Sequence, residues 1–265
     1  MTERMDKAQP KPLAAVSSAV PEKERGKLAK YAEVIPLPPD PDLPEPVAAH
    51  PDMILCEIWG TLFFSRRYAE AYPALIREIA EKSGKTVLLS DAPRSPVYPE
   101  DAGCNAFVWE REDEDSLLIG RLDILFPEIL RKAEEEGIRA VHVRQGYAAC
   151  SCLPLPSVLL TSDWGIMRAL KPYSDAVYWV PSDGILLPGY DQGFLGGASG
   201  VLRGEEGAEV FFFGDPSSME NAETLSRMLD AARADFHLLA EDHPLTDRGG
   251  IRFIYPAYAS GSTVR

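Results

Sequence analysis

Cysteine and histidine side chains give this chain its clearest means of covalent chemistry. Cys150 lies in a predicted loop after a short strand, and a cysteine thiolate is a strong nucleophile. His50 comes two residues before Asp52, whose carboxylate could orient the imidazole ring for proton transfer. If Arg144 lies near Cys150, we expect its charge to lower the pKa of the thiol. Together these residues predict nucleophilic catalysis with Cys150, His50 and Asp52 as the catalytic set.

Each of these residues also has a structural interpretation. Cys150 could be a buried cysteine in a tight turn, and His50 could be a turn residue that caps the proline-rich segment before it. The remaining cysteines and histidines favour packing, strand or loop roles: Cys56, Cys104, Cys152, His142, His237 and His243. The sequence leaves both interpretations of Cys150 and His50 open.

Carboxylates at predicted strand ends form a second group of candidates. Glu100 and Asp101 are adjacent after a proline turn, whereas Asp163 and Asp247 stand at the ends of apolar runs. A carboxylate that faces a central channel could bind a cation. The alternatives are that Asp163 caps a helix and that Asp247 pairs with Arg248.

No cofactor or metal site is predicted. The cysteines and histidines are too few and too scattered for a zinc site. Residues 193–200 read GFLGGASG, but a β-rich run follows them, so they do not form a dinucleotide-binding turn. We expect these glycines to permit positive φ angles and close backbone approach, with Gly196 and Gly197 facing a ligand.

Composition limits the possible partners. The chain has 265 residues, a net charge of −14 and a pI near 4.8, which argues against nucleic-acid binding through phosphate contacts. The charge is compatible with a cationic ligand, but a solvated acidic surface is the better explanation of it. No apolar run approaches the ~20 residues that span a membrane. We expect a cytoplasmic protein with reduced cysteines, and the sequence leaves its oligomeric state open.

The elements that must position these residues follow a repeated pattern. An apolar, β-rich run ends at a small or acidic residue, a helix follows, and a second β-rich run closes the unit. These runs end at Ser65, Gly120, Asp163 and Asp215. We expect these four positions to be equivalent around a pseudo-symmetric axis, with an abbreviated fifth repeat at 251–255.

The domain prediction is a disordered, dispensable tail over residues 1–30 and a single α/β domain over 31–265. The tail mixes charged residues, proline and alanine without an apolar rhythm. Within the domain, the pattern predicts a strand at 53–57 and one continuous helix at 67–82.

Several short motifs, taken together, resemble the pentein propeller. They are HPD at 50–52, YPED at 98–101 with NA at 105–106, QGY at 145–147, CS at 150–151, TSD at 161–163, LPGY at 187–190, GFLGG at 193–197 and DRGG at 247–250. The segment is similar to a bacterial branch of that fold with no assigned activity. The resemblance implies a propeller of about five strand–strand–helix–strand units.

The resemblance also implies a chemistry. Pentein enzymes such as arginine deiminases and amidinotransferases use a cysteine nucleophile, a histidine and carboxylates that hold a guanidinium group. It therefore implies a hydrolase or transferase that acts on a guanidino, amidino or related C–N compound, with a small cationic or polar molecule as partner. The implied substrate-binding residues are Glu100, Asp101, Asn105, Gln145, Asp163, Gly196, Gly197 and Asp247.

A non-catalytic pentein is the alternative, since the fold also includes a ribosome-associated initiation factor. The catalytic cysteine of the pentein enzymes lies in the last repeat, and no cysteine follows Cys152 here. That departure favours the alternative, whereas the polar motifs at strand ends favour a small-molecule site.

Overall fold

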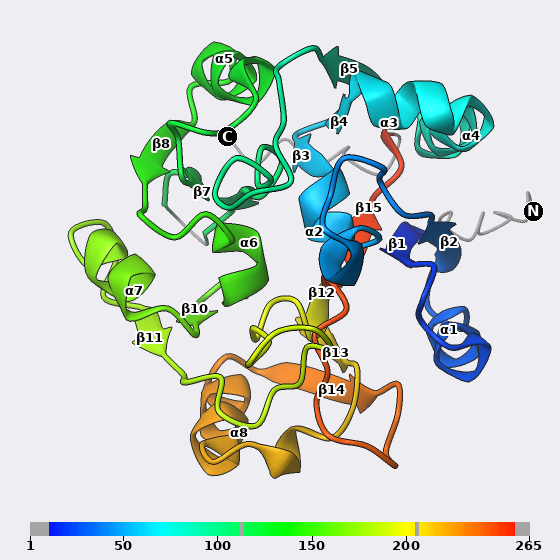
Figure 1. Cartoon of the computed structure of the whole chain (residues 1–265). Helices are drawn as coiled ribbons and strands as arrows, with labels where there is room; N and C mark the ends of the chain where they lie inside the picture. Colours follow the sequence, from blue (N-terminus) through cyan, green and yellow to red (C-terminus); the bar gives the residue numbers. More distant parts are fainter. Residues whose placement is uncertain (1–10, 112–113, 205–206, 258–265) are drawn as a thin grey trace, which may run out of the picture.

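Five three-stranded sheets surround a central axis in the computed structural model (Figure 1), which describes residues 11–111, 114–204 and 207–257. The inner strands are β15 (Arg252–Ile254), β3 (Cys56–Ile58), β6 (Phe107–Trp109), β9 (Cys152–Pro154) and β12 (Ser199–Arg203). The middle strands are β1 (Leu13–Ser17), β4 (Thr61–Ser65), β7 (Leu117–Gly120), β10 (Leu159–Thr161) and β13 (Ala208–Phe212). The outer strands are β2 (Glu33–Leu37), β5 (Thr86–Ser90), β8 (Arg139–His142), β11 (Val177–Trp179) and β14 (Ala234–Leu238).

Every sheet has the same topology. The middle strand is antiparallel to the inner strand and parallel to the outer one. A parallel pair needs a crossover, which helices supply at the periphery of the ring. The helices there are α1 (Glu22–Leu28), α3 (Arg66–Ala71), α4 (Pro73–Ser83), α5 (Pro127–Glu135), α7 (Trp164–Leu170) and α8 (Ala222–Ala231), with the 3-10 helix η2 (Pro216–Ser218) before α8.

The apolar core is divided among the five junctions between neighbouring sheets. In β13, Val210 and Phe212 pack against the β9–β10 side, while Phe211 and its neighbour Phe213 pack against β1 and α1. A middle strand that buries both faces is apolar at most of its positions. This explains the continuous apolar runs in the sequence and confirms the predicted propeller of repeated units.

The predicted strand ends occupy equivalent positions, each at or just after the end of a middle strand. Ser65 Oγ accepts a hydrogen bond from the Tyr68 backbone N–H (3.1 Å) at the start of α3. Asp163 caps α7 in the same way, through the Ile166 N–H (2.7 Å), and Asp215 caps η2. The small and acidic residues therefore mark the turns into the peripheral helices.

The N-terminal segment corrects the predicted domain boundary. Residues 1–10 lie outside the described residues, but residues 13–28 form β1 and α1 rather than a disordered tail. β1 is buried along its length and joins β2 on one side and C-terminal β15 on the other. The abbreviated fifth repeat is thus completed by the N-terminus, and dispensability of the whole segment is ruled out.

Two element predictions are also wrong in detail. The helix expected at 67–82 is two helices, because Pro73 has no N–H to donate and Tyr72 leaves the helical conformation. The strand expected at 53–57 begins only at Cys56, because the residues before it form the helical turn α2 (Pro51–Ile54). Figure 1 shows α2 and the similar turn α6 (Ala148–Ser151) near the centre of the ring, and the 3-10 helix η1 (Glu45–Val47) precedes α2.

Candidate functional site

A cavity of about 220 Å³ opens where α2 and α6 approach the ring centre. Its lining comes from α2 with the residues before it, from α6, from the 187–194 loop and from the turn before β15. The lining residues are Val47, His50, Met53, Tyr147, Cys150, Leu187, Tyr190, Asp191, Gln192, Phe194 and Asp247. The cavity therefore brings together three residues that the sequence singled out, His50, Cys150 and Asp247.

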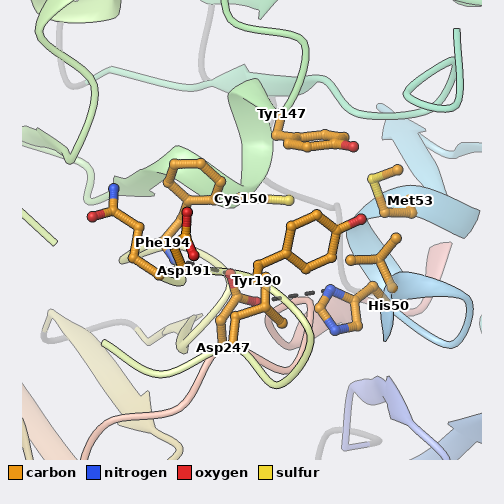
Figure 2. Close-up of a pocket in the computed structure, with 11 residues that line it drawn as sticks. His50, Met53, Tyr147, Cys150, Tyr190, Asp191, Phe194 and Asp247 are labelled. Atoms are coloured by element: carbon orange, nitrogen blue, oxygen red, sulfur yellow. Dashed lines mark hydrogen bonds and ion pairs between the residues drawn. The ribbon is translucent and has the colours of Figure 1, made fainter. Parts of the chain in front are cut away.

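His50 and Asp247 form one side of this cavity (Figure 2). The His50 Nδ1 atom lies 3.8 Å from the Asp247 Oδ1 atom, and both side chains are almost fully buried. Burial, with the nearby positive charge of Arg248 adding to it, lowers the pKa of His50 to about 4. The imidazole is therefore neutral at pH 7, which leaves a ring nitrogen free to accept a proton.

Backbone donors hold the Asp247 carboxylate. Its Oδ2 accepts a hydrogen bond from the Phe194 N–H (2.9 Å), and its Oδ1 accepts one from the Gly249 N–H (3.0 Å). The predicted pairing of Asp247 with Arg248 is not the arrangement found, since the Arg248 guanidinium lies 3.6 Å from Glu24 instead. Asp247 is thus fixed in place by the turn that carries it.

Cys150 is held by Asn105, a second buried residue. The Asn105 side-chain amide donates to the Cys150 Sγ (3.1 Å) and to the Met53 sulfur (3.2 Å), while its carbonyl accepts from the Ala149 N–H (2.7 Å). Asn105 therefore links α6 to α2 and sets where the thiol lies in the cavity wall. In Figure 2 the Cys150 sulfur lies between the rings of Tyr147 and Tyr190 in the view drawn.

The electrostatic setting of Cys150 is the reverse of the one expected. Burial raises the pKa of the Cys150 thiol well above its usual value, and the charges of Asp52 and Asp247 raise it further. Arg144 is exposed and is not among the causes of the shift, so the predicted lowering by Arg144 is wrong. In the unliganded pocket, Cys150 is therefore a neutral thiol at pH 7.

Asp52 lies behind the cavity wall and does not orient His50. Its side chain is fully buried, and neither carboxylate oxygen has a hydrogen-bond partner among the described residues. Burial raises the pKa of Asp52 to about 6, although the charge of Arg252 opposes the rise. Burial and the neighbouring charge of Asp52 raise the pKa of Asp247 to about 7. The two carboxyls therefore titrate as a coupled pair near neutrality.

Glycines make room for this arrangement. A Cβ atom on Gly197 would lie 2.0 Å from the Asp247 Oδ1, and one on Gly196 would lie 2.2 Å from the Cys152 carbonyl oxygen. Close approach is thus the reason for the 193–197 glycines, as predicted, but none of them has a positive φ. The positive φ angles lie at Gly249 and Gly250, and a Cβ on Gly249 would collide with His50.

The other predicted binding residues lie outside the cavity lining. Asp101 is buried behind Tyr147, whose hydroxyl donates to the Asp101 Oδ2 (2.6 Å), and burial raises the pKa of Asp101. Glu100 is exposed. The Gln145 amide donates to Asp163 (3.2 Å), which places both residues at the start of α7.

The aromatic and mouth residues of the cavity were not predicted. Tyr147, Tyr190 and Phe194 form its walls, and Asp191 and Gln192 lie exposed at its opening. Their motifs, QGY, LPGY and GFLGG, were visible in the sequence. What the sequence could not show is that the 187–194 loop folds back over the cavity, held by the Gly193 N–H bond to the Ile185 carbonyl (2.9 Å).

Within residues 11–111, 114–204 and 207–257, no group of three or more histidine, cysteine or acidic side chains could hold a metal ion. No helix in these same ranges has the length and apolar character to cross a membrane.

Solved structures resemble the whole chain. One is SxtG, an amidinotransferase from Microseira wollei in the saxitoxin biosynthetic pathway, with a TM-score of 0.55, 12% identity and coverage of 97% of this chain and 96% of SxtG. Another is the N-terminal domain of ArgZ, a cyanobacterial arginine dihydrolase, as a cysteine-to-serine mutant bound to substrate. Its TM-score is 0.51 at 11% identity, with coverage of 92% and 98%. At such low identity these likenesses establish the pentein fold alone.

Sequence comparison assigns the chain to a family. No curated protein matches it. One family model covers residues 15–252, which includes the last three residues of β1, all the cavity-lining residues and the start of β15. The chain therefore belongs to DUF6873, a family of unknown function.

Proposed function

We propose that this protein binds a small guanidino or amidino compound in the cavity and transforms it through Cys150. One observation carries the proposal: the buried thiol of Cys150, the neutral imidazole of His50 and the buried carboxyl of Asp247 line one cavity. A guanidinium is a planar cation that a carboxylate can hold, and its central carbon accepts a thiolate. The amidinotransferase and arginine dihydrolase of the same fold act on compounds of this class, which supports the proposal by analogy.

The raised pKa of Cys150 suits a reaction that begins only when substrate is bound. A guanidinium beside Asp247 would offset the negative charges that raise the pKa of Cys150, because a nearby cation favours the thiolate. The neutral His50 imidazole then accepts the thiol proton. Substrate thus supplies the positive charge that the empty cavity lacks.

The covalent step replaces one C–N bond of the substrate with a C–S bond to the protein. The Cys150 sulfur bonds to the guanidino carbon, and the C–N bond to the leaving amine breaks as His50 returns a proton to that nitrogen. The resulting amidino-cysteine is released either by water, in a hydrolase, or by a second amine, in a transferase. The proposal covers both outcomes, since both use the same covalent intermediate.

A non-catalytic binding protein for the same ligands is the second candidate. It is favoured by the burial of Cys150, which is only 4% exposed, and by the raised pKa of the thiol. In that case Asp247 and the aromatic walls bind the cation, and Cys150 is a packing residue in the cavity wall.

Binding and turnover measured together test both candidates. We expect agmatine, arginine or 1-butylguanidine to bind wild type and Cys150→Ala by calorimetry, and mass spectrometry to detect product and a cysteine adduct in wild type only. Cys152→Ala is the matched control, because Cys152 is equally buried but bonds to Thr161. Binding without adduct or product would establish the non-catalytic candidate. If no guanidino or amidino compound binds, both candidates fail.

A further inference from the structure

The cavity presents acidic side chains at two depths. Asp247 lies at its inner end with a side chain only 1% exposed, and Asp191 lies exposed at its opening. Among the described residues that line the cavity, none is a lysine or an arginine. A ligand in the cavity therefore meets a carboxylate at each end and no cationic side chain along its length.

Three arginines outside the lining lie near the cavity, and one of them, Arg252, acts on the buried Asp52 carboxyl. The Arg248 guanidinium lies 3.6 Å from Glu24, and Arg94 donates to the buried Asp40 (2.8 Å). None of these guanidinium groups lines the cavity, so a ligand anion there has no cationic side chain to bind.

The walls of the cavity also suit a cation. Tyr147, Tyr190 and Phe194 line the same cavity as the two aspartates, and the ring centroids of Tyr147 and Phe194 lie 6.4 Å apart in an edge-to-face arrangement. Aromatic faces carry partial negative charge and attract ammonium and guanidinium groups. A carboxylate in the same position would face both these rings and Asp191.

From this distribution of charge, and resting on the proposed function, we infer that the cavity selects guanidino compounds that carry no carboxylate. The preferred ligand has a guanidinium or amidinium at Asp247 and an amine at its other end, near Asp191. Amino acids with a guanidino group, arginine included, are discriminated against because their carboxylate has no cationic partner in the cavity.

Three ligands of similar length show how the group distant from the guanidinium affects affinity. Agmatine ends in an ammonium, 1-butylguanidine ends in a methyl group, and arginine adds a carboxylate to the ammonium. We expect calorimetry to give the affinity order agmatine, then 1-butylguanidine, then arginine. Agmatine should bind at least about tenfold tighter than arginine, because like charges placed together at a binding site are strongly penalised.

Substitutions at position 191 test the role of the opening. Asp191→Asn should weaken agmatine about two- to fivefold, the range for an exposed ion pair, and leave 1-butylguanidine unchanged. In Asp191→Arg, the affinity for arginine should equal or exceed the affinity for agmatine. Asp183→Asn is the matched control, because Asp183 is an exposed aspartate outside the cavity lining. We expect it to change none of the three affinities.

The outcomes separate this inference from the proposed function. If all three ligands bind equally and Asp247→Asn weakens them all, the cavity is a guanidinium site and the inference is wrong. An Asp191→Asn variant with unchanged agmatine affinity would also overturn it. If none of the three ligands binds wild type, the proposed function and the inference fail together.

Discussion

Two buried aspartates near Met53 differ in whether a charged side chain pairs with them. Asp40 is fully buried and its Oδ2 accepts a hydrogen bond from Arg94 (2.8 Å), which also donates to the backbone carbonyls of Met53 and Asp101. Asp52 is equally buried, yet its carboxylate has no hydrogen-bond partner among the described residues. The fold can therefore supply a cation where a buried charge is structural. Next to the cavity Arg252 acts on Asp52 without forming an ion pair with it, so the charge of Asp52 is less fully compensated than that of Asp40.

Arg94→Met should produce the largest change, because it leaves Asp40 buried without its partner. We expect a loss of about 3–5 kcal/mol in the free energy of unfolding, measured by urea denaturation. Arg66→Met removes an exposed ion pair with Asp91 and should cost under about 1 kcal/mol. Equal losses in the two variants would show that the Asp40 pair does not stabilise the fold.

Asp52→Asn should raise the free energy of unfolding relative to wild type as pH rises, whereas Asp40→Asn should lower it. The raised pKa of Asp52 means that the folded state holds this proton more tightly than the unfolded state. Wild type therefore loses stability as pH rises from about 4 through about 6, and Asp52→Asn removes that loss.

The measurement is the unfolding free energy of both variants and of wild type between about pH 4.5 and about pH 8. This range begins just above the usual pKa of an aspartate and ends above the raised pKa of Asp52. Relative to wild type, Asp52→Asn should gain on the order of 2 kcal/mol across this range. Asp40→Asn should be destabilised throughout, because Arg94 loses its charged partner. A pH-independent difference between Asp52→Asn and wild type would contradict the raised pKa.

Much of the fold could be predicted from sequence, because middle strands such as β13 bury both faces and are apolar at most of their positions. β1 could not, since Leu13-Ala14-Ala15-Val16 is short and its partner β15 lies at the other end of the chain. For the site, strand-end motifs predicted Cys150 and His50 in one pocket with at least one of Asp52, Asp163 and Asp247, and of these three aspartates only Asp247 lines the cavity. The direction of the Cys150 pKa shift was missed, because it depends on burial and on charges brought in from α2 and the last turn.

Gly197→Ala tests whether Asp247 needs the space that glycine leaves. The added Cβ would lie 2.0 Å from the Asp247 Oδ1, so the carboxylate or its turn must move. We expect a cost of about 1–3 kcal/mol in stability and a weakened affinity for guanidino ligands. Gly26→Ala is the control, because nothing lies within 4 Å of its added Cβ. Unchanged ligand binding in Gly197→Ala would mean that the position of Asp247 is not critical.

Tyr147→Phe should give the smallest change. It removes the hydroxyl that donates to the Asp101 Oδ2 and leaves that carboxyl without its side-chain donor. We expect about 1–2 kcal/mol of destabilisation at pH 8, and less at lower pH as Asp101 protonates, since its pKa is raised by burial. Thermal melts at the two pH values measure this. A cost that grows as pH falls would contradict an ionised Asp101 at pH 8.

The closure of the ring by β1 and β15 has a consequence for how the protein is made. β1 is synthesised before the other described strands, but its antiparallel partner at residues 252–254 is synthesised after all of them. Until β15 is made, β1 lacks its antiparallel edge partner, even though the β12–β13 residues that pack against one face of β1 have already been synthesised. Ring closure must therefore follow the release of nearly the whole chain. The same adjacency of the two ends makes the protein suited to circular permutation, with new termini placed in a peripheral loop between two sheets.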